Sequence, residues 1–344
     1  MKGTEDTEGT LLRVRDLGIT FDSYAGEVQA VRGVSFDLRR GETLAVVGES
    51  GSGKSVAVKS LMGLLPRNAR ITSGTATLGD TDLFALAEKE MRRIRGNRIA
   101  MVFQDPMTSL DPTMKIGEQI GESLRTNLGL RGAAVRQRAV ELLRQVHIPH
   151  PEARLKQYPH QLSGGMRQRV VIAIALAAEP EVLIADEPTT ALDVTIQAQV
   201  LDLLEDLRRS LGMSIILITH DLGVVARGAH RVVVMYGGKI VETGTARDIF
   251  HDPRMPYTWG LLTSIPLPAT DSSLELTPIS GSPPDPLHPP AGCPYHPRCP
   301  HAMKVCLEEM PEHTRFGAEH GAACWLLHPL APRVEPPPQF GGLR

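Results

Sequence analysis

The alternation of apolar and polar residues near the start of the chain predicts β-strands. Between Leu11 and Leu38, apolar positions alternate with polar ones, as in Leu12-Arg13-Val14 and Val34-Ser35-Phe36. This is the period of a strand with one buried face, and these strands are expected to be short. The turn Arg40-Gly41-Glu42 then leads into an apolar strand over Thr43 to Val47, which is expected to be buried.

Helical patterns and apolar strands alternate through the next part of the chain. A helix is expected from about Ser55 to Leu65, ended by Pro66, and a mostly helical stretch covers Gly117 to Val146 with a turn at Gly129 to Gly132. A buried helix over Val170 to Ala178 stops at Pro180, and the helix Ile196 to Leu211 joins two short strands, Val182 to Ala185 and Ser214 to Ile218. Strands alternating with helices predict an α/β fold with a covered parallel sheet.

The apolar segments are too short to cross a bilayer. The longest, Val170 to Ala178, falls well below the roughly 20 residues that a transmembrane helix needs. Residues Met1 to Thr10 are polar and acidic, so no signal segment is expected. The net charge of -2 gives no sign of the excess of basic residues that is typical of nucleic-acid-binding proteins. We therefore expect a cytoplasmic protein that reaches a membrane only through a partner.

The composition changes after about Phe250, where proline becomes frequent. All four cysteines lie beyond this point, and the tail from Pro329 is Pro-rich and expected to be extended or disordered. Because a disulfide framework is unusual in a cytosolic protein, the clustering of the cysteines suggests a separate ligand site. The chain contains no internal repeat.

One segment has the pattern of a phosphate-binding loop, G-x-x-x-x-G-K-[ST], over Gly48 to Ser55. Its glycines let the backbone turn tightly, so that N–H groups can point at phosphate oxygens, and the following helix adds its positive N-terminal end. Lys54 would neutralise the β- and γ-phosphates, and the Ser55 hydroxyl would bind Mg²⁺. The loop residues expected to hold nucleotide are Gly48, Ser50, Gly51, Gly53, Lys54 and Ser55.

Two acids follow the apolar strand that begins at Val182. Asp186 would lie at the carboxyl end of this strand, where open α/β sheets bind ligands, and would hold Mg²⁺. Glu187 would act as general base on the attacking water. The alternative is an exposed acidic turn leading into Pro188, which the presence of a phosphate loop disfavours.

The segment Leu162-Ser163-Gly164-Gly165-Met166 precedes a buried helix. Ser163 can cap that helix, and the glycines leave backbone N–H groups open. The segment is therefore a helix start that could also bind an anion, although one chain has no obvious use for a second anion site.

With these motifs in this order, residues 11 to 250 resemble the ABC ATPase family. The resemblance implies that Gln104 senses Mg²⁺ and water, and that Ser163 and Gly165 contact the γ-phosphate of ATP held by another subunit. It also implies that Asp193, in Ala191-Leu192-Asp193, lies at the dimer seam. Finally, it makes His220 the switch histidine that contacts the γ-phosphate; alone, this residue would be interpreted as an ordinary histidine at a strand end.

Two further positions bear on the nucleotide and the partner. Tyr24 is the candidate to stack on adenine, with Phe21 as a competitor, although a loop aromatic can simply pack. Met166 stands where many ABC ATPases have glutamine. The Leu-Ser-Gly-Gly-Met form resembles one of two paired ATPase subunits in peptide importers, which implies that the partner is a paralogue.

Three segments resemble the oligopeptide/dipeptide importer branch of this family. They are Phe103 to Pro112; Pro256 to Pro266, preceded by Met255 where histidine is common; and Gly292 to Pro300. The branch also contains nickel and sugar-oligomer importers, so the resemblance does not identify the solute.

The four cysteines could ligate one metal centre, as a [4Fe–4S] cluster or structural Zn²⁺, or remain free thiols. Their spacing is wider than in usual zinc sites, and similar subunits of this branch carry a [4Fe–4S] cluster, which favours the cluster. The four positions are Cys293, Cys299, Cys306 and Cys324. The nearby His296, His301 and His313 are expected to be surface residues or to support the ligands.

The expected fold is an α/β P-loop ABC ATPase core with an antiparallel β subdomain, a helical subdomain over about 105–178, and a small Cys-containing C-terminal domain. The expected domains are 11–250 for nucleotide binding, 251–330 for the C-terminal domain and 331–344 for the tail. ATP would close two such domains, and hydrolysis would reopen them.

The expected function is to power peptide uptake from the cytoplasmic face of the inner membrane. The expected partners are a second ATPase subunit, two permeases and an extracytoplasmic solute-binding protein. The alternatives are uptake of nickel or another small solute, a soluble ABC ATPase acting on DNA or ribosomes, and an exporter. The nucleic-acid alternative is disfavoured by the charge and by the absence of long insertions.

Overall fold

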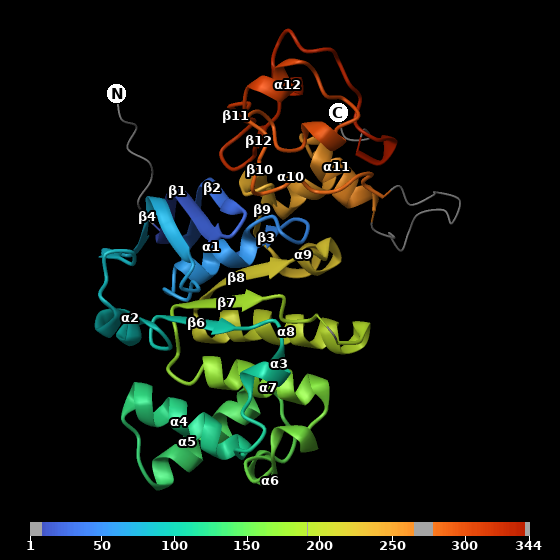
Figure 1. The fold of residues 1–344 in the computed structure, drawn as a ribbon. Helices are drawn as coiled ribbons and strands as arrows, with labels where there is room; N and C mark the ends of the chain where they lie inside the picture. Colours follow the sequence, from blue (N-terminus) through green and yellow to red (C-terminus); the bar gives the residue numbers. More distant parts are fainter. Residues whose placement is uncertain (1–8, 191, 265–277, 341–344) are drawn as a thin grey trace. The chain divides into compact units, whose positions relative to one another are not determined.

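The computed structural model describes residues 9–190, 192–264 and 278–340 (Figure 1). Four parts of the predictions lie outside these residues: the polar start of the chain through Glu8, Ala191 of the Ala191-Leu192-Asp193 segment, the pair Ile265-Pro266, and the last four residues of the tail. The chain divides into two compact units. Within the described ranges, no helix is both long enough and apolar enough to span a membrane.

Unit 1 is formed mainly by Leu38–Thr43 and Ala85–Ile218. Its strands β6 (Ile99–Val102), β7 (Val182–Asp186) and β8 (Ser214–Thr219) are parallel. The sequence pattern predicted β7, β8 and the parallel sheet, but not β6. All residues of β6 and β7 are buried, as expected for parallel strands covered on both faces. The helix α8 (Val194–Leu211) connects β7 to β8.

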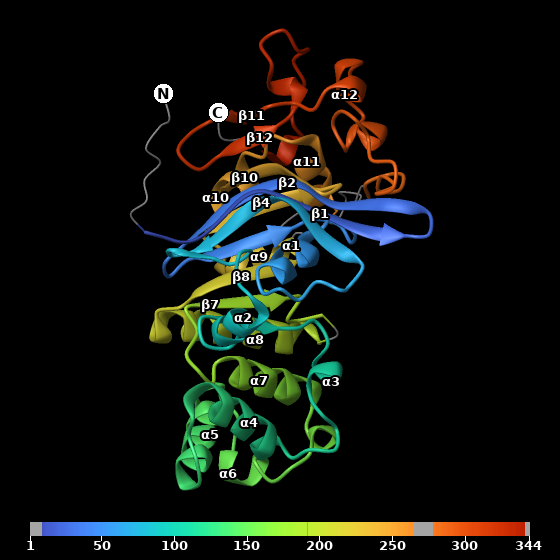
Figure 2. The same ribbon diagram turned by 60° about the vertical axis from the view of Figure 1, so that its left-hand side comes forward.

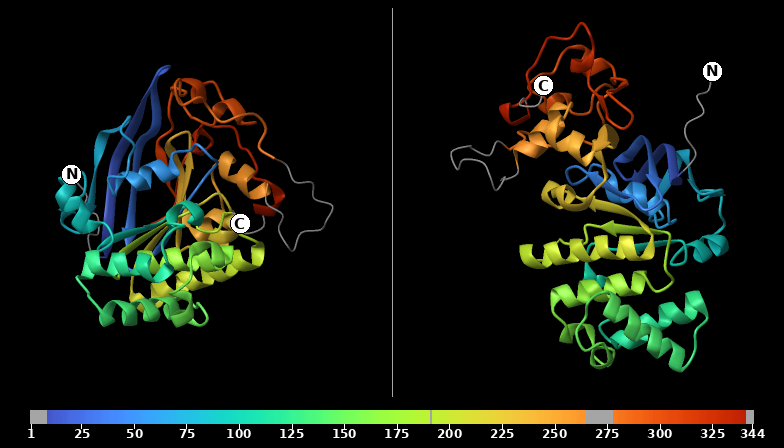
Figure 3. Two further views of the ribbon diagram at one scale, coloured as in Figure 1. Left: turned by 60° about the horizontal axis from the view of Figure 1, so that its bottom comes forward. Right: turned by 180° about the vertical axis from the view of Figure 1, so that it is seen from behind.

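The helices from α3 to α7 fall within residues 105–178, the range predicted for a helical subdomain (Figures 1 and 3). In it, α4, α5 and α7 contact one another, and α7 also contacts β6 and α8. The turn predicted between α4 and α5 is present, with Gly129 and Gly132 both at positive φ. These helices are α3 (Pro106–Ser109), α4 (Ile116–Leu128), α5 (Ala133–Gln145), α6 (Pro151–Arg154), the 3₁₀ turn η1 (Pro159–Gln161) and α7 (Gly164–Ala175). Helix α2 (Glu88–Ile94) precedes this range.

The start of α7 differs from the prediction. The apolar run begins at Val170, but the helix begins at Gly164. The prediction that Ser163 caps this helix is confirmed, because its hydroxyl oxygen accepts a hydrogen bond from the Met166 N–H at 3.3 Å. The polar first turns of the helix carry no apolar signal, so hydrophobic periodicity alone places its start too late.

Unit 2 is formed by Leu11–Asp37, Leu44–Phe84 and the chain from Thr219 onward. It contains an antiparallel sheet of strand order β2-β1-β4-β5 (Figure 2). The prediction of short strands was wrong, because β1 and β2 each extend over 14 residues. Between Arg15 and Ile19 the register of β1 against β4 shifts, and this irregularity interrupts the alternation. The strands are β1 (Thr10–Ser23), β2 (Gly26–Arg39), β4 (Ala69–Leu78) and β5 (Thr81–Asp82).

A second set of strands in unit 2 has the order β11-β12-β10-β9-β3. The predicted buried strand β3 pairs in parallel with β9, and the other pairs are antiparallel. The strands are β3 (Thr43–Val47), β9 (Arg231–Tyr236), β10 (Lys239–Thr245), β11 (His313–Arg315) and β12 (Gly321–Ala323). Helices α9 (Leu222–Gly228), α10 (Ala246–His251) and α11 (Pro256–Thr263) complete this part.

Helix α1 (Lys54–Ser60) follows β3 and is shorter than predicted. The expected end was Leu65, before Pro66, but the chain leaves the helix through a turn in which Gly63 adopts φ 59°. Glycine accepts this left-handed conformation without a steric penalty, so it ends the helix before the proline is reached.

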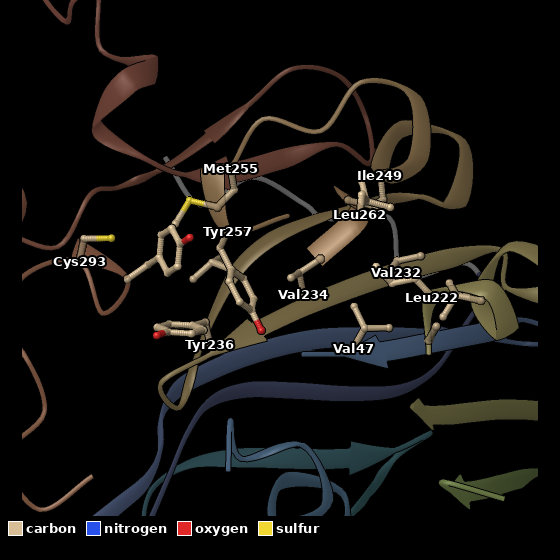
Figure 4. Close-up of a cluster of buried hydrophobic side chains, with 14 of the residues drawn as sticks. Val47, Leu222, Val232, Val234, Tyr236, Ile249, Met255, Tyr257, Leu262 and Cys293 are labelled. Carbon is tan, nitrogen blue, oxygen red and sulfur yellow. The ribbon is translucent and has the colours of Figure 1, made fainter. Parts of the chain in front are cut away.

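The cysteine-containing segment shares its core with β9 and β10 and has only short elements of its own. Tyr236, Tyr257 and Tyr295 form a ring cluster with centroid distances of 4.4 to 5.3 Å, and Cys293 lies beside it (Figure 4). The short elements are η2 (His296–Arg298), α12 (Val305–Glu308), η3 (Trp325–Leu327) and η4 (Pro338–Phe340). In residues 329–340 of the tail, η4 is the only helical or strand element, in agreement with the predicted extended tail.

Candidate functional site

The phosphate loop lies between β3 and α1, as the motif requires. Gly48, Gly51 and Gly53 all have positive φ, at 146°, 80° and 96°. A side chain at Gly48 would place its Cβ 2.1 Å from the Met235 carbonyl oxygen, and one at Gly53 would come within 2.4 Å of the Ala30 carbonyl oxygen. These glycines therefore permit both the backbone conformation and the close packing of the loop.

Lys54 is buried beneath the loop, with 5% of its surface exposed. Its ammonium group donates hydrogen bonds to the carbonyl oxygens of Gly48 at 2.7 Å and Glu49 at 2.9 Å. These hydrogen bonds place the positive charge of Lys54 directly against the backbone of the loop that is predicted to bind phosphate. Ser55, half-buried, is the second residue of α1.

The packing of Gly48 gives a direct stability test. We expect Gly48→Ala to lower the free energy of unfolding by about 2–3 kcal/mol, because the new methyl group would overlap the Met235 carbonyl. Gly51→Ala is the matched control: its Cβ meets no atom within 4 Å, so it should cost only the backbone strain of about 1 kcal/mol. Denaturant unfolding without nucleotide measures both, and equal losses would contradict the proposed overlap.

The two predicted carboxylates occupy different environments at the end of β7. Asp186 is 2% exposed and is the last residue of the strand. Glu187 has φ 48°, a rare conformation for a residue with a side chain, and strained backbone of this kind concentrates at functional sites. Its backbone N–H donates to the Ile218 carbonyl at 2.9 Å, which fixes the turn. The alternative of a loose acidic turn is therefore disfavoured.

Gln104 lies next to Glu187. The Gln104 side-chain amide donates a hydrogen bond to Glu187 Oε2 at 2.8 Å. The Thr190 hydroxyl donates to the same oxygen at 3.0 Å. Thr190 was missed by the sequence analysis; its only signal is its position three residues after Glu187, on the same turn. The two donors orient the carboxylate.

The signature segment packs against the segment around Asp193. A Cβ on Gly165 would come within 2.7 Å of the Ile196 side chain, so only glycine fits there without movement. The Asp193 carboxylate accepts the Ile196 N–H at 2.9 Å and caps α8. Ser163 and Gly164 are exposed, so the start of α7 is accessible to another molecule.

The remaining predicted positions are exposed. His220 directly follows β8, and Tyr24 lies in the turn between β1 and β2 with its side chain fully exposed. Its competitor Phe21 is half-buried within β1 and lies opposite Ala69. Tyr24 is thus the more accessible of the two aromatic candidates.

Two family models match separate parts of the sequence. Residues 31–190 match the family model described as ABC transporter. Residues 241–306 match the model described as oligopeptide/dipeptide transporter, C-terminal region. The second match contains three of the four cysteines and leaves Cys324 outside its range.

Curated relatives match over nearly the whole chain. The oligopeptide transport ATP-binding protein OppD of Bacillus subtilis is 57% identical, with 95% of this chain and 92% of the relative covered. The chain belongs to the ABC transporter family of oligopeptide and dipeptide transport ATP-binding proteins. The dipeptide transport ATP-binding protein DppD of Lactococcus lactis is 55% identical, with 96% of this chain and 94% of the relative covered.

Solved structures confirm the ABC ATPase fold of this peptide-transport ATP-binding protein. A dimeric ATP-binding cassette, MJ0796, in a post-hydrolysis state with ADP and Pi, aligns with a TM-score of 0.62 and 28% identity over 69% of this chain and 99% of that one. The cassette cbiO1 from Clostridium perfringens, part of an ABC transporter complex, gives a TM-score of 0.62 and 29% identity over 71% of this chain and 92% of that one.

The four cysteines of this ATP-binding protein lie in one region but do not form a compact ligand group. The Cys293 N–H donates to the Cys306 carbonyl at 2.9 Å, and the His296 ring nitrogen Nδ1 lies 2.9 Å from the Cys293 carbonyl oxygen. Burial raises the pKa of Cys293 to about 11 and that of Cys324 to about 12, and the charges of the other cysteines add to both shifts. Bound metal would therefore have to displace protons from these thiols.

Among the described residues, no group of three or more His, Cys, Asp or Glu side chains is arranged to hold a metal ion. All four cysteines are free thiols. The arrangement thus gives no support to the predicted [4Fe–4S] cluster or to the alternative of zinc.

Proposed function

We propose that this ABC ATPase binds and hydrolyses ATP to drive uptake of dipeptides or oligopeptides through a membrane transporter. The observation that carries the proposal is the presence, in one chain, of an intact phosphate loop with its buried lysine and a C-terminal region matching the oligopeptide/dipeptide model. The names of the relatives support peptides as the transported class.

In this proposal, the loop residues Gly48, Ser50, Gly51, Gly53 and Lys54 hold the phosphates, and Tyr24 stacks on adenine. Mg²⁺ would be held by oxygen ligands, which this ion prefers, and the candidates Ser55, Gln104 and Asp186 all carry a side-chain oxygen. Bound Mg²⁺ would neutralise the developing phosphate charge.

The protein's own residues would then act on the water and the γ-phosphate. Glu187, oriented by Gln104 and Thr190, would accept a proton from water as the water attacks in line. His220 would donate a hydrogen bond to the γ-phosphate. A carboxylate held by two donors has little rotational freedom, which keeps the proposed base in one orientation.

The exposed signature suggests a second ATPase subunit. In the proposed dimer, Ser163 and Gly165 would contact the ATP that the partner holds. Asp193 would lie at the interface between the two subunits. Met166 indicates that the partner is a paralogue. The further proposed partners are two permeases and an extracytoplasmic solute-binding protein. The subunit would then associate peripherally with the cytoplasmic face of the inner membrane.

We keep the predicted domains as part of the proposal: residues 11–250 for nucleotide binding, 251–330 for the C-terminal domain and 331–344 for the tail. The match of residues 241–306 to the C-terminal model supports a boundary near residue 250. Tyr236 and Tyr295, one on each side of this proposed boundary, are in ring contact at 5.3 Å.

We also keep a [4Fe–4S] cluster at the four cysteines as a proposal. The proposal rests on the resemblance to subunits of this branch that carry such a cluster. All four cysteines lie in or against one buried apolar cluster, as a common site would require. Anaerobic purification with iron and zinc analysis tests this: about four irons per chain are expected, whereas stoichiometric zinc or no metal would refute the cluster.

The function is tested by purifying the chain with its permeases and reconstituting the complex in vesicles with the binding protein. ATP hydrolysis should be stimulated by peptides and should drive their accumulation. Stimulation by nickel alone would replace the peptide proposal with the metal-import alternative. Tight association with nucleic acid and no permease would overturn the transporter assignment.

A further inference from the structure

The Arg298 side chain joins the cysteine-containing segment to the phosphate loop. Its two terminal nitrogens donate to the two carboxylate oxygens of Glu49, at 2.5 and 3.1 Å. The remaining donors go to the Tyr236 hydroxyl at 3.1 Å and to the carbonyls of Ile279 at 3.1 Å and Ser280 at 2.9 Å. All five N–H donors of the guanidinium are therefore used. The side chain is only 5% exposed.

Glu49 is the second residue of the phosphate loop, and it is fixed at two points. Besides its carboxylate, its backbone N–H donates to the Tyr257 hydroxyl at 2.9 Å. The guanidinium carbon of Arg298 also lies 5.8 Å from the centre of the Tyr236 ring. Both tyrosines belong to the buried ring cluster, so the first turn of the loop is anchored to a rigid part of the core.

The proline-rich residues 283–289 lie against one side of the same loop. The cavity between Glu49–Ser52 and residues 283–289 has a volume of only about 20 Å³, which is close to the space needed by one water molecule. The Gln29 N–H donates to the Pro286 carbonyl at 2.9 Å, and the Gly238 N–H donates to the Ser52 carbonyl at 3.2 Å. The loop therefore has little room to move toward this side.

The charge of Glu49 explains why this anchor matters. A carboxylate in a loop that binds a triphosphate would repel the ligand, and the repulsion would be weakly screened in a partly buried place. The bidentate pair with Arg298 neutralises this charge and holds the carboxylate in one orientation.

We propose that Arg298, from the segment between Cys293 and Cys299, is a positioning residue for the phosphate loop, acting through Glu49 on the affinity for ATP. This inference rests on the proposed ATPase function and names a residue that no nucleotide motif contains. Arg298 does not touch the nucleotide; it neutralises Glu49 and holds the loop in the conformation that binds phosphate.

Four variants of the full chain test the proposal: Arg298→Met, Arg298→Lys, Glu49→Gln and the double variant Arg298→Met/Glu49→Gln. Arg298→Met should raise the KM for MgATP and the Kd for MgADP by about tenfold, with a smaller change in kcat. Arg298→Lys should recover little of this loss, because an ammonium group cannot form the fork-shaped pair.

The double variant separates positioning from a structural role. Removing the Glu49 charge should restore part of the nucleotide affinity that Arg298→Met loses, because no unpaired carboxylate then remains. A role limited to folding predicts that both variants lose stability but keep the wild-type nucleotide affinity per folded molecule. The matched control is Arg315→Met on the exposed strand β11, which should leave the KM unchanged.

Metal content and thermal stability are measured for every variant. The proposal is overturned if folded Arg298→Met keeps the wild-type affinity, if the double variant is no better than the single one, or if affinity falls only in preparations that have lost metal. Wild-type binding and hydrolysis in the same assays test the ATPase function separately, so its failure is distinguishable from failure of the Arg298 proposal.

Discussion

Glu187→Gln is expected to stop ATP turnover while leaving nucleotide binding intact. The amide cannot accept the proton of the attacking water, and loss of general-base catalysis should lower kcat roughly 100- to 10,000-fold. The amide oxygen can still accept the hydrogen bonds from Gln104 and Thr190, so the turn should keep its shape. Single-turnover hydrolysis and equilibrium binding of MgATP would measure the two properties separately.

The control for this prediction is Glu141→Gln on α5. Glu141 belongs to a surface ion pair with Arg138 and has no contact with the proposed reacting groups. Its kcat should equal that of the wild type. If Glu187→Gln hydrolysed ATP at the wild-type rate, Glu187 would not be the base.

Lys54→Ala should remove most of the affinity for ATP. The buried ammonium group now binds the Gly48 and Glu49 carbonyls, and on nucleotide binding it would exchange these for phosphate oxygens. Loss of charge-assisted hydrogen bonds of ~1.5–3 kcal/mol corresponds to a Kd for MgATP increased about 10- to 100-fold. Calorimetric titration of the full chain measures this change.

Lys89→Ala provides the matched control, because Lys89 is an exposed lysine on α2. Its affinity should not change. The Lys54 variant must also be checked for folding, since its alanine leaves the two loop carbonyls without these donors. Wild-type affinity in a folded Lys54→Ala protein would contradict the role of Lys54 in phosphate binding.

The sequence predicted the elements that combine a clear apolar period with a motif. The phosphate loop, the strand that ends at Asp186 and the two helices around Gly129 are where the pattern placed them. These features depend on local residue types. Glycines occupy the positions where φ is positive, and a run of apolar residues forms the buried strand. The resemblance to a known family then gave the order of the other motifs.

Features that depend on long-range contacts were not predictable in the same way. The 14-residue length of β1 depends on pairing with β4, and the register shift near Gly18 hides it from a simple alternation. The contact between Arg298 and Glu49 joins positions 249 residues apart, and neither residue belongs to a motif that names the other. Such pairings are fixed by packing in the folded chain, which a single sequence does not display.

Because the ring cluster of Tyr236, Tyr257 and Tyr295 includes a residue of the C-terminal segment, correct folding of that segment affects how long the ATPase survives in the cell. Damage that loosens Tyr295 would expose the aromatic face of β9, and exposed apolar surface marks a protein for chaperones and proteases. A cell would then lose the subunit itself, and not only its activity. The amount of this ATPase subunit in the cell would then depend on whether the C-terminal segment, which contains no nucleotide motif, is correctly folded.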